Sequence, residues 1–120
     1  MILNSDDQTQ WRHEYDQRQY RRMIERLESF EAGHLHLGGL VGDLGALLTA
    51  LEEKPPNSWA HEFSVLHLEL DMMNSLATYD AATSFSRKPA LTNAEMRRAL
   101  EIAASLKRLV GPKIDASADG

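Results

Sequence analysis

Residues 24–53, IERLESFEAGHLHLGGLVGDLGALLTALEE, decide the fold of this chain. The apolar residues at the start of this stretch, up to Phe30, stand three positions apart, a spacing that places them on one face of an α-helix. Gly33 supplies a helix stop. A leucine-rich segment then begins at Leu37, and its other positions hold mainly glycine and aspartate. Two helices joined by a Gly-His loop predict an all-helical protein.

The size and composition predict one soluble domain. The chain has 120 residues, of which 42% are hydrophobic and 26% charged, as in ordinary globular proteins. We assign residues 1–112 to the helical domain and expect residues 113–120 to form a polar tail. The absence of cysteine excludes disulfides and thiolate metal sites and agrees with a reducing cytoplasm. The apolar runs are too short to span a bilayer, and the N-terminus lacks a signal-peptide layout, so we expect a cytoplasmic protein that does not bind membranes.

Four helices are expected to cover nearly the whole chain. Their predicted ranges are 5–32, 37–53, 57 to about 82, and 92–110. Two prolines end the second helix, and a Thr-x-x-Glu capping box opens the fourth. Short connections between such helices predict a four-helix, mostly antiparallel bundle. An irregular, orthogonal packing of the same helices is the alternative.

The third predicted helix is apolar on two sides. One stripe has the spacing of a core face and consists of Trp59, Phe63, Leu66, Leu70, Met73 and Ala77. A second stripe, on nearly the opposite side, consists of Val65, Leu68, Met72 and Tyr79. Such a helix either lies at the centre of its bundle or offers one face to another protein. Val65, Leu68 and Met72 are therefore candidate residues for self-association.

Negative charge is concentrated in the middle of the chain. The formal net charge is −5, and residues 33–86 carry seven acids with Lys54 as their one base. Such a segment repels nucleic-acid phosphates and attracts a basic partner. The arginines of the first helix alternate with acids, so we expect no nucleic-acid partner. The plainer interpretation is that the acids only solvate exposed helix faces.

No residue pattern indicates catalysis or a bound metal. His34 and His36 flank Leu35, but a zinc site needs at least three protein ligands, and no third one is near in sequence. Bundles hold di-iron with Glu-x-x-His pairs on two helices, and the one such pair, Glu31 with His34, straddles a helix end. Phosphate-binding loops, nucleophile elbows and zinc-binding helix motifs are absent from the sequence. We therefore expect no catalytic residue, no metal and no cofactor, and interpret the chain as a binding protein rather than an enzyme.

The segment from residue 24 to about residue 63 carries a family resemblance. A helix ends in an F-E-x-G-type turn, a short L-x-L follows, and an L-V-x-D-L-x-A-L-x-x-A-L helix precedes a Trp that opens the next helix. The residues that match are Phe30, Glu31, Gly33, Leu35, Leu37, Leu40, Val41, Asp43, Leu44, Ala46, Leu47, Ala50, Leu51 and Trp59. This half of the chain resembles small all-helical bacterial immunity proteins, which are encoded beside polymorphic or contact-dependent growth-inhibition toxins. The group tends to carry charged residues where this chain has Gly39, Gly42 and Gly45, so no contact residue carries over by motif.

The resemblance implies a function in toxin neutralisation. An immunity protein binds the C-terminal domain of its cognate toxin one-to-one, and here the acidic middle would imitate an anionic ligand in a basic cleft, such as that of a nuclease. The candidate partner-binding residues are Asp43, Glu62, Glu69 and Asp71. The alternative is a homodimeric helical adaptor or regulator that associates through the second stripe of the third helix. A helical metal or small-ligand enzyme is a third interpretation.

Overall fold

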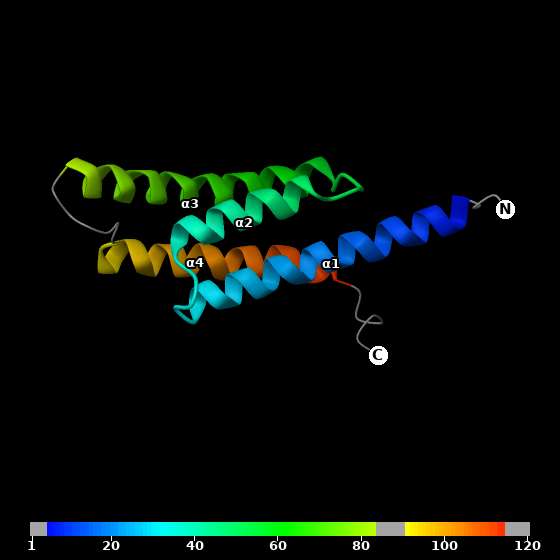
Figure 1. The fold of residues 1–120 in the computed structure, drawn as a ribbon, viewed down its shortest axis with the longest axis horizontal. Helices are drawn as coiled ribbons and strands as arrows, with labels where there is room; N and C mark the ends of the chain where they lie inside the picture. Colours follow the sequence, from blue (N-terminus) through cyan, green and yellow to red (C-terminus); the bar gives the residue numbers. More distant parts are fainter. Residues whose placement is uncertain (1–4, 84–90, 115–120) are drawn as a thin grey trace.

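The computed structural model describes residues 5–83 and 91–114, and the side chains of 9–79 and 91–114. It is an all-α, four-helix, mostly antiparallel bundle, with no strand in the described ranges (Figure 1). The elements, in chain order, are α1 (Ser5–Glu31), α2 (Leu37–Thr49), α3 (Asn57–Thr83), α4 (Asn93–Val110) and the 3-10 turn η1 (Gly111–Lys113). The fold class expected from the sequence is confirmed.

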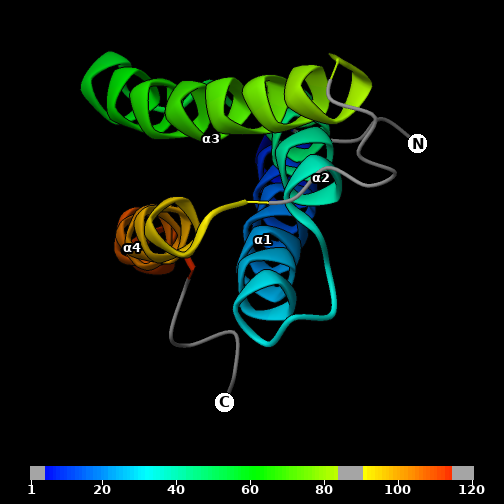
Figure 2. The ribbon, with the colours of Figure 1, turned by 90° about the vertical axis from the view of Figure 1, so that its left-hand side faces the viewer.

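The helices lie at the corners of the bundle. Both α1 and α3 pack against α2 and α4, so α1 and α3 occupy diagonal corners (Figure 2). Consecutive helices run in opposite directions, and the N-terminal part of α1 extends past the other helices (Figure 1). The outer faces of α1 and α3 consequently lie on opposite sides of the molecule.

The interior is built from one apolar stripe of each helix. The largest side chains that are less than 2% exposed come from all four helices: Phe63, Met23, Leu27, Leu40, Leu44, Leu70, Ile102, Leu106 and Val110. The core face of α4 includes Ile102, which is 1% exposed, but not Met96, which is 39% exposed. Met96 instead lines a hollow beside the α1–α2 connection.

The ends of α1 and α4 follow the local sequence signals. Gly33 has a φ of +82°, the left-handed conformation that ends a helix, and the His34 amide donates to the Ser29 carbonyl at 2.9 Å. At the start of α4, the Thr92 hydroxyl accepts a hydrogen bond from the Glu95 amide at 3.1 Å, and the Glu95 carboxylate accepts one from the Thr92 amide at 2.9 Å. Both predicted caps are confirmed.

The second helix is shorter than the sequence suggests, since it ends at Thr49 rather than near Glu53. Beyond that end the chain is bound by Asp16 of α1, which is 6% exposed. Its two carboxylate oxygens accept hydrogen bonds from the backbone amides of Glu52 at 2.8 Å and Glu53 at 2.9 Å. Burial, with the negative charges of Asp16 and Glu53, raises the pKa of the Tyr20 phenol, which stays neutral. A buried carboxylate thus holds the loop between α2 and α3 against α1.

Trp59 joins three helices at the start of α3. Its indole Nε1 donates a hydrogen bond to the Leu109 carbonyl of α4 at 2.9 Å. Its ring stacks on Phe63 with the ring centroids 5.3 Å apart and meets Tyr20 of α1 edge-on at 5.9 Å. The Lys113 ammonium lies 5.4 Å from the centre of the same ring. These contacts fix the start of α3 over the end of α4.

Parts of two expected segments fall outside the described residues. The predicted loop from residue 82 to residue 91 begins later than expected because α3 continues to Thr83, and residues 84–90 lie outside the described ranges. The expected tail begins with Lys113, whose carbonyl accepts a hydrogen bond from the Gln17 side chain at 2.6 Å. Ile114 is partly buried against the core, and residues 115–120 are not described.

Replacing Asp16 by asparagine is expected to destabilise the fold by about 1–3 kcal/mol. Asparagine keeps one acceptor oxygen, but its amide group would face the second backbone N–H and leave that buried donor unsatisfied. Urea unfolding of Asp16→Asn measures the change in free energy of unfolding. Asp71→Asn, at a half-buried carboxylate without such bonds, serves as the control and should shift stability by less than about 0.5 kcal/mol. Equal effects of the two substitutions would contradict this role for Asp16.

Replacing Gly42 by alanine is expected to stabilise the protein by about 1 kcal/mol. A Cβ atom at Gly42 would meet no heavy atom within 4 Å, so the full helix-propensity gain is available. At Gly38 a Cβ would lie 3.3 Å from the Asn74 side chain, and Gly38→Ala should therefore gain less. Thermal unfolding of the two variants makes the comparison. A larger gain at Gly38 than at Gly42 would show that the helix packing differs from that described.

Candidate protein-binding surface

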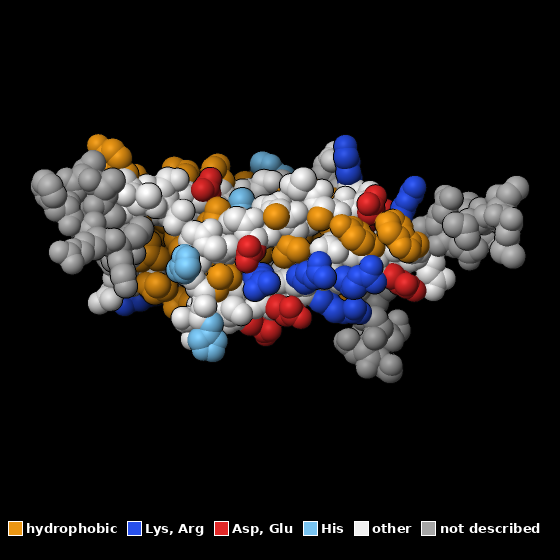
Figure 3. All heavy atoms as spheres, in the orientation of Figure 1, with side chains coloured by type: hydrophobic (Ala, Val, Ile, Leu, Met, Phe, Trp, Pro, Cys, Tyr) orange, Lys and Arg blue, Asp and Glu red, His pale blue; other side chains and the backbone are white. Residues whose placement is uncertain are grey.

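The outer face of α3 is apolar along most of its length. Five large hydrophobic side chains on this face are 50–65% exposed: Val65, Leu68, Met72, Leu76 and Tyr79. We call them the α3 stripe. They follow one another at intervals of three or four residues, so they share one side of the helix. Figure 3 shows hydrophobic side chains along the edge that α3 occupies in Figure 1. The second apolar stripe of this helix is therefore not buried within the bundle.

All three residues predicted for self-association, Val65, Leu68 and Met72, belong to the α3 stripe. Leu76, which is 59% exposed and follows Met72 by four residues, was not among the residues predicted from the sequence. Its signal was present, since the same helical spacing continues from Met72 through Leu76 to Tyr79. The structure thus extends the predicted patch by one helical turn.

The acids predicted for partner binding do not share one face. Glu69 pairs with Arg98 of α4, and Glu62 lines a groove between α3 and α4, so both lie on the α4 side of the α3 stripe. Asp71 follows His67 by one helical turn, and His67 contacts the Val41 carbonyl of α2 at 2.8 Å. Asp71 therefore lies on the α2 side of the stripe.

Asp43 lies apart from the other three acids. It belongs to α2 and pairs with Arg26 of α1, with 3.4 Å between the carboxylate and the guanidinium nitrogen. This ion pair bridges the flank of the bundle between α1 and α2. Only Glu62, Glu69 and Asp71 therefore border the α3 stripe.

The formal charges that α3 contributes around the α3 stripe are all negative. The sequence of α3 contains no lysine or arginine. The Lys and Arg side chains on the face drawn in Figure 3 gather mainly over α1. Glu69 is neutralised within the chain, because the Arg98 guanidinium donates to both of its carboxylate oxygens at 2.6 and 2.9 Å. Glu62 and Asp71 have no ion pair or hydrogen bond with any described residue.

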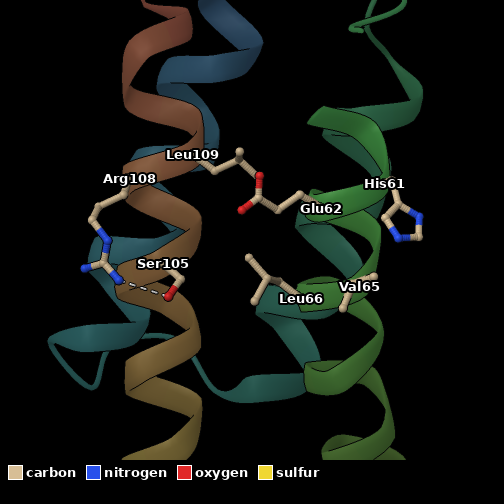
Figure 4. Close-up of a pocket in the computed structure, with 7 residues that line it drawn as sticks. All are labelled: His61, Glu62, Val65, Leu66, Ser105, Arg108 and Leu109. Atoms are coloured by element: carbon tan, nitrogen blue, oxygen red, sulfur yellow. Dashed lines mark hydrogen bonds between the residues drawn. The ribbon is translucent and has the colours of Figure 1, made fainter. Parts of the chain in front are cut away.

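A groove beside the stripe separates α3 from α4. Its volume is about 810 Å³, and the residues that line it are His61, Glu62, Val65, Leu66, Ser105, Arg108 and Leu109 (Figure 4). Val65 belongs both to this groove and to the α3 stripe, so the two form one continuous surface. Within that surface the apolar α3 stripe lies next to a groove of mixed lining that contains the Glu62 carboxylate.

The two histidines that flank Leu35 do not belong to the groove between α3 and α4. His34 and His36 line the hollow beside the α1–α2 connection, which has a volume of about 880 Å³ and mainly apolar walls. Across the described ranges, no three His, Asp or Glu side chains come close enough together to hold a metal ion. None of the described helices combines the length and apolar character needed to cross a bilayer.

Comparison with known proteins adds no relative, since no protein-family model, no curated protein and no solved structure matches this chain.

The Glu69–Arg98 pair is expected to give the protein a measurable acid sensitivity. Hydrogen bonding from Arg98 lowers the pKa of Glu69 below its ordinary value of about 4.3. The stabilisation is therefore present above the unfolded-state pKa and is lost as the pH falls through the folded-state pKa. Between about pH 6 and about pH 3, Glu69→Gln should lose less free energy of unfolding than the wild type. The expected difference is small because the pair is exposed and screened by solvent.

Urea unfolding at several pH values measures this difference. Glu62→Gln, which removes an unpaired carboxylate from the same helix, is the matched control. A Glu69→Gln profile parallel to the wild-type profile would show that the pair contributes nothing to folding.

Proposed function

We propose that this chain is an immunity protein that binds one-to-one and neutralises the C-terminal domain of a cognate bacterial toxin in the cytoplasm. The observation that supports the proposal is the α3 stripe, an apolar helix face that the bundle leaves exposed and that is bordered by acids. The resemblance of residues 24–63 to immunity proteins supplies the class of partner. No described group of side chains suggests catalysis, and the proposed activity needs none.

The α3 stripe has the composition of an interface core. Protein interfaces combine an apolar, often aromatic and methionine-containing centre with a polar rim, and a few central side chains supply most of the binding energy. Met72 lies near the middle of the stripe, and methionine adapts its shape to a partner surface. Glu62 and Asp71 supply the polar rim on the two sides. A face with this arrangement suits a tightly bound protein partner.

The charge of the surface favours a basic partner. Glu62 and Asp71 form no ion pair with any described residue, and α3 contains no lysine or arginine. A positively charged toxin surface would therefore meet complementary charge, which raises the association rate and excludes acidic partners. Nucleases are one class of toxin with such a surface. Asp43 is excluded from this surface because it lies on another flank and already pairs with Arg26.

The test is to express the toxin domain encoded by the gene immediately upstream in a susceptible cell, with and without this protein. Growth rescue and copurification of the two proteins are expected. The double variant Leu68→Ser/Leu76→Ser should weaken toxin binding at least about tenfold for each residue replaced. It should therefore abolish growth rescue. Because both side chains are more than half exposed, the fold should not change.

Trp11→Ser is the matched control, since Trp11 is 56% exposed but lies on α1. It should rescue growth as well as the wild type does. Rescue by the double variant would exclude the α3 stripe as the interface. A harmless upstream domain, or one that kills regardless of this protein, would remove the support for the immunity function.

A homodimeric adaptor or regulator is the second candidate, and the same exposed α3 stripe favours it. In a twofold dimer through α3, however, both copies would bring acids and no bases on the contacting helices, and like charges would face each other. Sedimentation over a range of concentrations decides between the two. A mass that doubles with concentration, and returns to the monomer value in Leu68→Ser, would establish the dimer.

A further inference from the structure

The groove between α3 and α4 contains a carboxylate beside three aliphatic side chains, Val65, Leu66 and Leu109. In Figure 4 the Glu62 side chain leaves α3 and extends across the groove toward Leu109 of α4. Leu66 lies below it between the helices, and Val65 lies on the outer edge toward the α3 stripe. The groove has a volume of about 810 Å³. The Glu62 carboxylate thus lies beside the aliphatic side chains of Leu66 and Leu109 (Figure 4).

Neither of two arginines of α4 near the groove, Arg98 and Arg108, pairs with Glu62. Arg108 lines the groove, but its guanidinium donates to the Ser105 hydroxyl at 3.0 Å and lies on the outer side of α4 (Figure 4). Arg98 is bound to Glu69 and also contacts Glu101 at 3.3 Å. The His61 ring lies at the edge of the groove and is directed away from Glu62 (Figure 4). Glu62 therefore faces the groove without an ion pair to any described residue.

We infer that this groove holds a basic side chain of the partner, an arginine or a lysine. The aliphatic part of such a side chain would lie against Val65, Leu66 and Leu109, and its cation would meet the Glu62 carboxylate. Long basic side chains bind in this way, with an apolar stem on carbon and a charged head on an acceptor. A guanidinium can in addition donate two parallel hydrogen bonds to one carboxylate.

The position of the groove connects it to the proposed interface. Val65 is shared between the groove and the α3 stripe, so a protein that covers the stripe brings its neighbouring side chains to the groove. The identity of the partner rests on the proposed function, whereas the affinity of the groove for an alkyl cation does not. The two can be tested separately.

The first experiment uses butylguanidinium as a probe of the isolated protein. In an NMR titration it should shift the methyl signals of Val65, Leu66 and Leu109 in a saturable way. Glu62→Gln should weaken this binding about tenfold, because a charge-assisted hydrogen-bonded contact is lost. Butanol, which has the stem without the charge, and guanidinium, which has the charge without the stem, should both bind more weakly than butylguanidinium.

Three results would overturn the inference. Equal binding by Glu62→Gln would show that the carboxylate does not hold the cation. Shifts confined to other surfaces would place the probe elsewhere. Binding that occurs only in Arg108→Ala would show that Arg108 of this chain already occupies the groove.

The second experiment measures binding of the upstream toxin domain by calorimetry. Glu62→Gln should raise the Kd about tenfold. Glu25→Gln, an exposed acid on the outer side of α1, should leave the Kd unchanged. If the wild type binds the toxin and Glu62→Gln binds equally well, the groove is not a contact, although the proposed function stands. If the wild type does not bind the toxin, the proposed function fails, and the butylguanidinium titration still decides whether the groove accepts a cation.

Discussion

A four-helix bundle has one interior, and each helix can bury one stripe of apolar side chains in it. The helix α3 carries two stripes. The stripe that contains Phe63 and Leu70 fills the interior, so the stripe that contains Leu68 and Met72 has no place within this chain and stays exposed. Exposed apolar surface of this extent on one helix usually marks an interaction site. The proposed function therefore follows from how many apolar faces the bundle can accommodate, rather than from any catalytic group.

Polar contacts anchor the start of α3 at one end of the bundle. Asp16 binds the loop that precedes α3 through two backbone amides, and Trp59 binds the Leu109 carbonyl at the end of α4. Both side chains are buried, so loss of either set of bonds would leave donors or acceptors unsatisfied. These contacts hold the start of α3, and burial of Phe63 and Leu70 turns one stripe of the helix into the core. With that face buried, Glu62 lies at the groove and Asp71 on the other side of the α3 stripe.

The proposed surface combines two kinds of recognition. Apolar contacts with the α3 stripe do not depend on direction, and they supply contact area. A hydrogen-bonded ion pair with Glu62 in the groove would depend on direction and would select a cation with an aliphatic stem. Immunity proteins must distinguish their own toxin from related ones, and specificity of that kind needs a polar contact that a wrong partner leaves unsatisfied. In this protein the apolar stripe would give affinity to a class of partners, and the groove would restrict which member of the class fits.

The sequence by itself determined the features that depend on neighbours within about one helical turn. It predicted the helices, the stop at Gly33, the capping box at Thr92 and the two stripes of α3, because helical periodicity and capping are local. Only the tertiary structure decided the rest. The attachment of the loop after α2 depends on Asp16, 36 residues away from Glu52, and the neutralisation of Glu69 depends on Arg98, 29 residues away. The separation of Asp43 from the other acids likewise depends on how α1 packs on α2. Such pairings follow from the positions and rotations of whole helices, which are set by the packing of the entire core and leave no signal in the spacing of residues along the chain.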